Sequence, residues 1–353
     1  MTMNVLGYAA PSAKDALEPY QFERRDMRSD DIVIEILYCG ICHTDIHYVQ
    51  NDWGRSTFPL VPGHEIIGQV ANVGPDVTRF KQGDYVGVGC MVDSCQHCVA
   101  CKQGLEQYCE KGPTFTYNSK DRAENTTTFG GYSEKIIVSE KFVLRIPDGM
   151  DLKGAAPLLC AGITTWSPLR HWKVEKGTNV GVIGLGGLGH MALKLAKALG
   201  ANVTLFTRSP GKEQDARQLG ADNIVISTDA NQMTAVNDKF SLIIDTVPYV
   251  HDVNTYMSSL SLDGTLVLVG FPGILDAPPL NTVPLVMSRK SVAGSDIGGI
   301  AETQELLDFC GEHDIVSDIE VIKIQDINEA YKRMLKSDVK YRFVIDMVSL
   351  KAP

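Results

Sequence analysis

Long hydrophobic runs are missing from this sequence of 353 residues. No stretch approaches the ~18 consecutive apolar residues that a membrane-spanning helix needs. The N-terminal segment also lacks the basic start and the apolar core that mark a secretory signal. We therefore expect a cytoplasmic protein with no membrane partner.

Positive charge is also scarce. The chain has 33 Lys and Arg residues against 43 Asp and Glu residues, which gives a formal net charge of −10. Nucleic acids and anionic membrane surfaces attract basic proteins, so an acidic chain argues against both as partners. We expect a small-molecule substrate instead.

The nine cysteines are an odd number and are unevenly spread. In a long chain without a secretory signal, clustered cysteines are metal ligands more often than disulfides. Four of them follow the spacing Cys95-x2-Cys98-x2-Cys101-x7-Cys109. Four thiolates in one loop can surround one ion tetrahedrally and close it to solvent, which predicts a structural zinc site.

Other interpretations of this loop stay open at this point. The thiols could be unconnected, or they could form two disulfides. The triple spacing also resembles the cysteine run of a ferredoxin, so an iron–sulfur cluster is a competitor. Zinc is favoured over the cluster because the final gap is longer and no proline follows Cys109.

The hydrophobic pattern changes along the chain. The first ~150 residues are β-rich and punctuated by Gly and Pro. From about Gly177 onward, short apolar strands alternate with helical segments, which predicts a doubly wound parallel sheet. Strands are predicted at 32–38, 65–73, 84–88, 179–183, 202–206, 223–226, 241–245, 265–269, 291–293 and 341–347, and helices after 188, before 220, at 302–310 and at 327–335.

This change predicts an α/β protein of two domains, since a single core stops growing at roughly 250–300 residues. We expect a catalytic zinc domain at 1–160, a dinucleotide-binding domain at 161–296, and a C-terminal segment at 297–353 that returns to the catalytic domain.

A glycine-rich turn occupies residues 184–189, between an apolar strand and the start of a helix. Alone, such a turn could serve packing only. In this context its glycines let the backbone approach a pyrophosphate, and the helix N-terminus attracts its charge. The predicted cofactor contacts are Gly184, Gly186, Gly187, Leu188 and Gly189.

The end of the second strand predicts which nicotinamide cofactor binds. An NAD site usually places Asp or Glu there to hold the ribose hydroxyls. This sequence has no acid at that point and offers Thr207, Arg208, Ser209 and Lys212 instead. Two positive charges and two hydroxyls suit a 2′-phosphate, so NADP is preferred, although these could also be solvated turn residues.

Three further segments contain chemistry-bearing residues that are unremarkable one by one. They are residues 39–47, Gly63-His64-Glu65, and residues 158–162 around Cys160. Together they make the sequence resemble the zinc-containing medium-chain alcohol dehydrogenases, most closely their cinnamyl-alcohol-dehydrogenase-like branch. The resemblance covers essentially the whole chain. It is carried by residues 39–45, Gly63-His64-Glu65-x2-Gly68-x5-Gly74-x2-Val77, residues 83–86, the four-cysteine loop, residues 159–164, the glycine turn and residues 341–343.

The resemblance implies a GroES-like catalytic domain, a Rossmann domain and two zinc ions per subunit. It implies that Cys42, His64 and Cys160 bind a catalytic zinc with an open fourth position, with the acid Glu65 beside the metal. Thr44 and His47 match the family's proton relay, and Asp52 matches an acid near the zinc site. Implied cofactor contacts are Thr164, Val269, Gly270, Ser295 and Arg342, and the implied assembly is a homodimer joined at the sheet edges of the cofactor domains.

The resulting functional hypothesis is hydride transfer between NADP(H) and a primary alcohol/aldehyde pair, with broad aliphatic and aromatic aldehydes. The plant lignin enzymes of this branch have a bulky Trp where this chain has residues 111–116, so we expect a different pocket, with Trp53 and Phe115 as candidate aromatic walls. One alternative is an NAD-linked polyol or secondary-alcohol dehydrogenase of the same fold. Another is a non-catalytic nucleotide-binding protein, which retention of all three catalytic zinc ligands disfavours.

Overall fold

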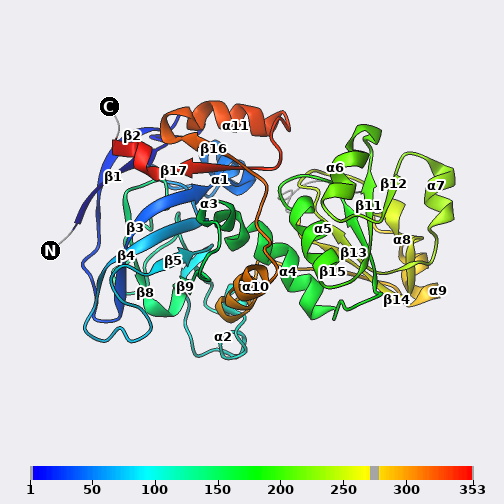
Figure 1. Ribbon diagram of the computed structural model, residues 1–353, viewed down its shortest axis with the longest axis horizontal. Coiled ribbons are helices and arrows are strands. Elements are labelled where there is room, and N and C mark those ends of the chain that lie inside the picture. Colours follow the sequence, from blue (N-terminus) through cyan, green and yellow to red (C-terminus); the bar gives the residue numbers. More distant parts are fainter. Residues whose placement is uncertain (1–2, 271–277, 352–353) are drawn as a thin grey trace. The chain divides into compact units, whose positions relative to one another are not determined.

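The computed structural model describes residues 3–270 and 278–351. The chain divides into two compact units, one made of residues 1–160 and 298–353 and the other of residues 161–297. Both are drawn in Figure 1. The catalytic and cofactor-binding roles that the sequence assigns to these two parts stay predictions.

The unit of residues 161–297 contains a six-stranded parallel sheet in the order β12-β11-β10-β13-β14-β15. Two strands that follow one another along the chain, β12 and β13, are separated in this order, so the topology reverses beside β10. In sheets of this kind, ligands bind in the crevice beyond the carboxyl ends of the strands at that reversal. Its strands are β10 Asn179–Ile183, β11 Asn202–Thr207, β12 Asn223–Ile226, β13 Phe240–Asp245, β14 Leu260–Leu268 and β15 Ser291–Gly294.

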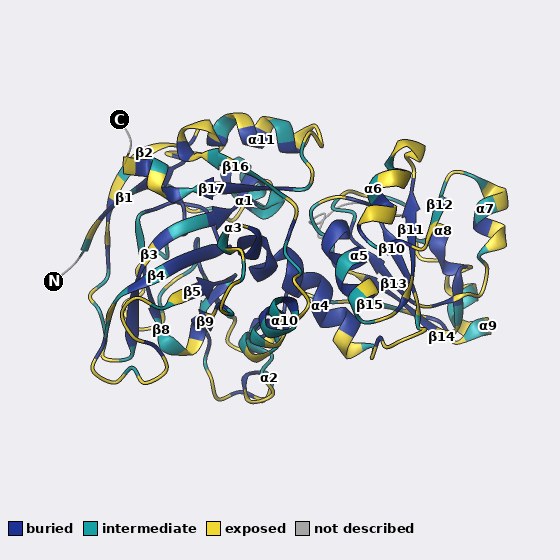
Figure 2. Cartoon of the chain, viewed as in Figure 1, coloured by how far each residue is buried: buried dark blue, intermediate teal, exposed yellow. Residues whose placement is uncertain are grey.

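The strands of this sheet form because their side chains are apolar on both faces. Four of the five residues of β10 are buried, and Figure 2 shows the same dark interior along the neighbouring strands. Parallel strands covered on both faces are typically continuous apolar runs, which is why the sequence predicted them. The helices of this unit are α4 Ala161–His171, α5 Gly189–Ala198, α6 Glu213–Gln218, α7 Ala230–Ala235, α8 Asn254–Met257 and α9 Thr282–Ser288.

The other unit is built around a seven-stranded sheet. Six of its strands run in the order β16-β17-β3-β4-β5-β9, and β8 pairs with β3. Two smaller sheets pair β1 with β2 and β6 with β7. The strands are β1 Met3–Ala9, β2 Glu18–Arg24, β3 Asp31–Gly40, β4 Ile66–Val73, β5 Tyr85–Val88, β6 Met91–Asp93, β7 Thr114–Phe115, β8 Lys135–Ser139, β9 Leu144–Arg145, β16 Ile319–Lys323 and β17 Arg342–Asp346.

The C-terminal part of the chain contributes directly to this sheet. Strand β17 pairs antiparallel with the end of β3, so that Val344 lies opposite Gly40. The pairing brings the start of β17 beside the residues that follow β3 and precede β4. Helices of this unit are α1 His43–Gln50, α2 Val99–Lys102, α3 Leu152–Ala155, α10 Ile300–Glu312 and α11 Ile327–Leu335.

Every strand predicted from the sequence is found, with ends that differ by a few residues. Residues 118–131 contain no named helix or strand. Among the described residues, no helix combines the length and apolar character that crossing a bilayer requires.

Candidate active site

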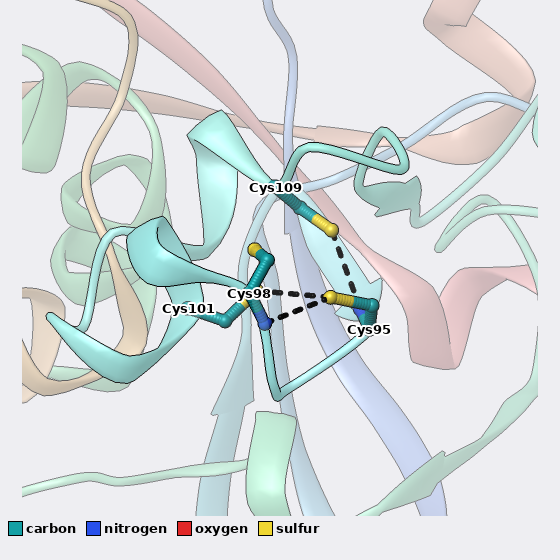
Figure 3. A group of neighbouring side chains, drawn as sticks. All are labelled: Cys95, Cys98, Cys101 and Cys109. Atoms are coloured by element: carbon teal, nitrogen blue, oxygen red, sulfur yellow. Dashed lines mark hydrogen bonds between the residues drawn. The ribbon is translucent and has the colours of Figure 1, made fainter.

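The four-cysteine loop folds into a single cluster of sulfurs between β6 and β7 (Figure 3). The sulfurs of Cys95, Cys98, Cys101 and Cys109 all lie within 4.8 Å of one another. Cys98 begins the short helix α2, whose turn brings Cys101 back toward Cys95. All nine cysteines of the chain are free thiols, so the structure contains neither of the two disulfides considered for this loop.

Backbone amides favour the thiolate form of three of these cysteines, Cys95, Cys98 and Cys109. The amide of Cys98 donates to Cys95 Sγ at 3.4 Å, and that of Cys95 donates to Cys109 Sγ at 3.4 Å. The pKa values of Cys95 and Cys98 are lowered, chiefly by the N–H groups of His97 and Cys101 respectively. Burial raises the pKa of Cys101 to about 12. Four soft sulfur donors, supported in this way, suit a closed tetrahedral zinc site.

A second cluster gathers side chains that are far apart in the sequence. Cys42, His64, Glu65 and Cys160 place one ligand atom each within 4.8 Å of one another. Cys42 follows β3, His64 and Glu65 precede β4, and Cys160 follows the 3-10 helix Ala156–Leu159. Antiparallel pairing of β3 with β4 brings the first three together. Two thiols, one imidazole and one carboxylate form a donor set that fits zinc.

Glu65 fits closely against the backbone of β3. A Cβ added at Gly40 would lie only 1.9 Å from Glu65 Oε2, so only glycine leaves room for this carboxylate. Oε1 of Glu65 is paired with the guanidinium of Arg342, and both side chains are buried. Oε2 is buried and has no hydrogen-bond partner among the described residues. An unpartnered buried carboxylate oxygen beside two thiols and an imidazole is the feature expected where a cation completes the site.

Burial dominates the electrostatics of this carboxylate. It raises the pKa of Glu65 to about 7, and the charge of Arg342 opposes the rise. The anionic groups around Arg342 in turn raise the pKa of its guanidinium despite burial. The sequence resemblance assigned Arg342 to the cofactor. The structure places it at the start of β17, in contact with Glu65.

Asp45 orients His64 and was not singled out from the sequence. Its fully buried carboxylate lies 3.1 Å from His64 Nδ1. It also accepts from the amides of Cys42 at 2.9 Å and Gly63 at 3.1 Å and from the hydroxyl of Tyr132 at 3.2 Å. An acceptor on Nδ1 assigns the proton of a neutral imidazole to that nitrogen and leaves Nε2 as the ligand atom. Burial is the largest single effect and lowers the pKa of His64, but the charges of Asp45 and Cys90 and the hydrogen bonds to Asp45 and Cys42 together raise it well above its ordinary value.

The two thiols of this cluster share a proton. The Cys160 thiol donates to Cys42, which lowers the pKa of Cys42 and raises that of Cys160. A third thiol, Cys90, also contacts Cys160 and lies 3.8 Å from the carbonyl of Leu159. Metal ions bind the thiolate form of cysteine. The lowered pKa of Cys42 therefore favours metal binding by this pair of thiols.

Helix α1 presents the two residues of the predicted proton relay. Its capping box links Cys42 and Asp45, and both Thr44 and His47 are partly buried on its first two turns. His47 Nδ1 lies 2.7 Å from the carboxylate of Asp52. Asp52 is therefore a partner of His47, and no metal-ligand group of the described residues includes it.

Aromatic rings continue from His47 toward His64. The ring of Trp53 lies 5.1 Å from that of His47 and 5.0 Å from that of Tyr48. Tyr117 lies 5.3 Å from Tyr48 and 5.8 Å from His64, measured between ring centroids. Trp53, predicted as an aromatic wall, thus belongs to a row of rings that reaches the second cluster. Phe115, the other predicted wall, lies in β7.

The glycine turn has the backbone that a dinucleotide requires. Gly184 has φ of +89°, in the region that side chains rarely adopt, and a Cβ at Gly189 would lie 2.2 Å from the carbonyl oxygen of Gly184. A Cβ at Gly186 would meet nothing within 4 Å, so this position faces open space. Helix α5 begins at Gly189, so the positive end of its dipole lies at this turn.

The residues after β11 place positive charge beside this turn. Lys212 Nζ donates to the carbonyl of Leu185 at 3.0 Å, which joins the basic segment to the glycine turn. Burial lowers the pKa of Lys212. Arg208 and Ser209 are exposed, and Thr207 is buried with its hydroxyl accepting from the amide of Ser209 at 3.1 Å. The predicted four residues are thus neighbours in one short segment.

The other predicted cofactor residues lie at the ends of elements. Val269 and Gly270 follow β14 and donate to the carbonyl of Asp245 at 3.0 Å each. Ser295 follows β15, and its amide donates to Leu268 at 3.1 Å. These residues gather beyond the carboxyl ends of the parallel strands. Thr164 is buried within α4.

Comparison with known proteins agrees with both units. Residues 28–148 match the model of the alcohol dehydrogenase GroES-like domain, and residues 187–312 match that of the zinc-binding dehydrogenase. An aldehyde reductase, YahK of Escherichia coli K12, is 52% identical over 345 residues, which cover 98% of each chain. A probable mannitol dehydrogenase of Stylosanthes humilis is 50% identical, with 97% of this chain and 96% of the relative covered.

A solved structure extends the similarity to three dimensions. The structure of CAD from Helicobacter pylori, complexed with NADP(H), superposes with a TM-score of 0.92 at 42% identity and covers 99% of each chain. The resemblance and fold class predicted from the sequence are confirmed. The chain belongs to the zinc-binding alcohol dehydrogenase family, with a GroES-like domain and a Rossmann-type parallel-sheet domain.

Proposed function

We propose that this protein is a zinc-dependent alcohol dehydrogenase that reduces aldehydes to primary alcohols with NADPH. The observation that carries the proposal is the convergence of Cys42, His64 and Cys160, with the unpartnered oxygen of Glu65, in one buried cluster. A closed structural site would use all four donors. A catalytic site keeps one position for substrate, and a carboxylate that is also paired with Arg342 can yield that position.

The residues of the second cluster would hold a zinc ion through Cys42 Sγ, His64 Nε2 and Cys160 Sγ. When bound, such an ion polarises a carbonyl oxygen as a Lewis acid. Asp45 fixes the orientation and tautomer of His64. Cys95, Cys98, Cys101 and Cys109 would hold a second, structural zinc, for a total of two per subunit.

The Rossmann unit would hold NADP(H), which supplies the hydride when bound. The open space at Gly186 and the amides at the start of α5 suit the pyrophosphate. Thr207, Arg208, Ser209 and Lys212 suit the 2′-phosphate. We further assign Gly184, Gly187, Leu188, Gly189, Thr164, Val269, Gly270, Ser295 and Arg342 to the cofactor. The relative complexed with NADP(H) supports this choice of cofactor.

Proton delivery is assigned to helix α1. The Thr44 hydroxyl can donate a proton to the developing alcohol oxygen and be reprotonated from His47. The partly exposed imidazole of His47, held at 2.7 Å by Asp52, can exchange protons with solvent. Asp52 is a positioning residue in this scheme.

The row of rings at Tyr48, Trp53 and Tyr117 favours aldehydes with aliphatic or aromatic bodies. The aldehyde reductase relative supports this substrate class. The probable mannitol dehydrogenase relative supports polyol oxidation as a second candidate. Aromatic side chains offer apolar contact and few hydrogen bonds, so we favour the aldehydes over a polyol.

A substrate screen with both cofactors tests the proposed function. We expect metal-replete protein to oxidise NADPH at 340 nm with benzaldehyde and short aliphatic aldehydes, with kcat/KM at least about tenfold higher than with NADH, because charge-assisted contacts recognise the 2′-phosphate. Mannitol with NAD is the matched reverse assay. A preference for NADH, or faster turnover of mannitol than of any alcohol in the panel, would contradict the proposal.

We also propose a homodimer formed at the free edge of the parallel sheet. Strand β15 ends the sheet, and α9 beside it exposes Val283, Val286 and Met287 at 63%, 79% and 79%. The backbone groups of an edge strand can pair with the edge strand of a second copy, and such pairing would cover the apolar helix beside it. We expect light scattering to give twice the chain mass, and Met287→Glu to shift it toward the monomer. The control is Val348→Glu, at a position that is 64% exposed in the other unit; dissociation by both variants, or by neither, would contradict this interface.

A cytoplasmic location is proposed as well. Nine free thiols, six of them assigned to metal sites, need a reducing compartment. Recovery of the native protein in a secreted or periplasmic fraction would contradict this assignment.

A further inference from the structure

A histidine and a buried carboxylate form a pair at the end of β13. Asp245, the last residue of this strand, is 2% exposed, and its Oδ2 lies 2.8 Å from His251 Nε2. His251 belongs to the loop between β13 and α8 and remains 24% exposed. The proposed function leaves both residues without a role.

The surroundings of His251 favour its cationic form. Nδ1 donates to the backbone carbonyl of Tyr249 at 2.8 Å, so this nitrogen carries a proton. A neutral ring would then turn the lone pair of Nε2 toward the anionic oxygen of Asp245, which is repulsive. A proton on Nε2 converts this contact into an ion pair. Nε2 is buried against Asp245, so the cation would act on a bound anion through its charge.

The charged and titratable groups around the ring come from three other elements. Asp245 approaches from the end of β13, Arg208 from the segment after β11, and Tyr256 from α8, with ring centroids 6.4 Å apart. Asp252 is the adjacent residue of the same loop. The hydrogen bond with Asp245 raises the pKa of His251, while burial and the nearby Arg208 oppose the rise.

This pair lies where the parallel sheet reverses its order. Strand β13 is the neighbour of β10, and Asp245 pairs with Ile183, the residue before the glycine turn. The loop after β13 closes on that turn, since a Cβ at Gly184 would lie 3.1 Å from a methyl group of Val247. His251 and Arg208 thus reach the same crevice from the strands on either side of β10.

We propose that the His251 imidazolium, held by Asp245, is a third cation of the 2′-phosphate pocket beside Arg208 and Lys212, and that it makes the affinity for NADP(H) depend on pH. The inference rests on the proposed use of NADP(H). It adds a specificity-determining residue from the β13 loop to the segment after β11. Asp245 is its positioning residue.

The sign of the pH effect follows from the two ionisations. The 2′-phosphate becomes a dianion above its second pKa of about 6, which strengthens binding as pH rises. His251 has a raised pKa, so its charge is complete at low pH and is lost as pH rises through that value. Affinity for the phosphate should therefore pass through a maximum and fall on the alkaline side, whereas ligands without the 2′-phosphate should not show that fall.

Calorimetric titration of the full-length enzyme with 2′,5′-ADP and with 5′-AMP isolates this phosphate. For His251→Gln at pH 7 we expect about five- to tenfold weaker binding of 2′,5′-ADP, the size of one charge-assisted contact, and less than twofold change for 5′-AMP. His251→Arg should retain the affinity and lose the alkaline fall. Asp245→Asn should shift the fall to lower pH. The matched control is His171→Gln in the same unit, which should change neither ligand.

The outcomes separate this inference from the proposed function. Wild-type protein that binds 2′,5′-ADP no better than 5′-AMP refutes the NADP(H) assignment itself. Wild-type preference that survives in His251→Gln with the same alkaline fall refutes only the role of His251. Equal losses for both ligands also refute it, because they show that the ring supports the pocket generally. Thermal denaturation identifies a misfolded variant, and His251→Arg then provides the test through its pH profile.

Discussion

Replacement of Cys160 by Ser should lower kcat/KM for aldehyde reduction by at least about a thousandfold, the several kcal/mol that Lewis-acid polarisation contributes. Cys160 supplies one of the two sulfurs of the cluster with His64. Serine is a poor zinc ligand at neutral pH because its hydroxyl stays protonated, so the metal should be lost or weakly held. Elemental analysis should fall from two zinc ions per chain to one, measured beside steady-state kinetics.

The matched control is Cys310→Ala, which removes a buried thiol from α10, outside both metal-ligand groups. It should keep two zinc ions and turnover within a few-fold of wild type. Cys160→Ser protein with two tightly bound zinc ions and nearly normal turnover would show that the second cluster is not the catalytic site. Protection from thermal denaturation by NADPH should be unchanged in both variants, since the residues proposed to bind the pyrophosphate and the 2′-phosphate come from other segments.

The two metal clusters differ in how far the sequence could predict them. The four-cysteine loop needs only 15 residues from Cys95 to Cys109 and a short helix to fold around an ion, so its spacing carried the prediction. Cys42, His64 and Cys160 meet only because β3 pairs with β4 and a 3-10 helix returns before Cys160. No local pattern encodes that meeting, and the family resemblance was needed to group them.

The partners of these residues were harder still to predict. Asp45 had a local signal, because it lies three residues after Cys42 and completes a capping box at the start of α1. Tyr132, which donates to Asp45, comes from a loop distant in the sequence and left no pattern. The pair of Asp245 and His251 was missed because strand prediction locates the end of β13 but not the path of the loop that follows it.

The secondary structure shows the same contrast: elements with a local sequence pattern were predicted, and elements without one were missed. The parallel strands were predicted because burial on both faces requires continuous apolar runs. Helix α4 was missed: nine of its eleven residues are buried, so no polar face marks its period, and Pro168 lies inside it. The strands β7 and β9 have two residues each, too few for any alternation to appear.

Replacement of Cys109 by Ser should destabilise the protein while sparing the chemistry. The four sulfurs form one site. Removal of one of them leaves three thiols, which cannot enclose a metal ion. The free energy of metal binding at such a site contributes to the folding stability of the loop that forms it. We expect one zinc ion to be lost and the melting temperature to fall by about 5–10 °C, a loss of a few kcal/mol. The control Gln103→Ser alters an exposed residue of the same loop and should leave both quantities unchanged.

The decisive comparison is between the two cysteine variants. Below its melting temperature, Cys109→Ser should retain kcat/KM within about tenfold, since Cys42, His64 and Cys160 remain in place, whereas Cys160→Ser should lose turnover. Both lose one zinc ion, so metal content alone cannot produce the contrast. Loss of all turnover in folded Cys109→Ser protein, at a temperature where circular dichroism shows native structure, would mean that the four-cysteine loop takes part in catalysis and that the division into a structural and a catalytic metal is wrong.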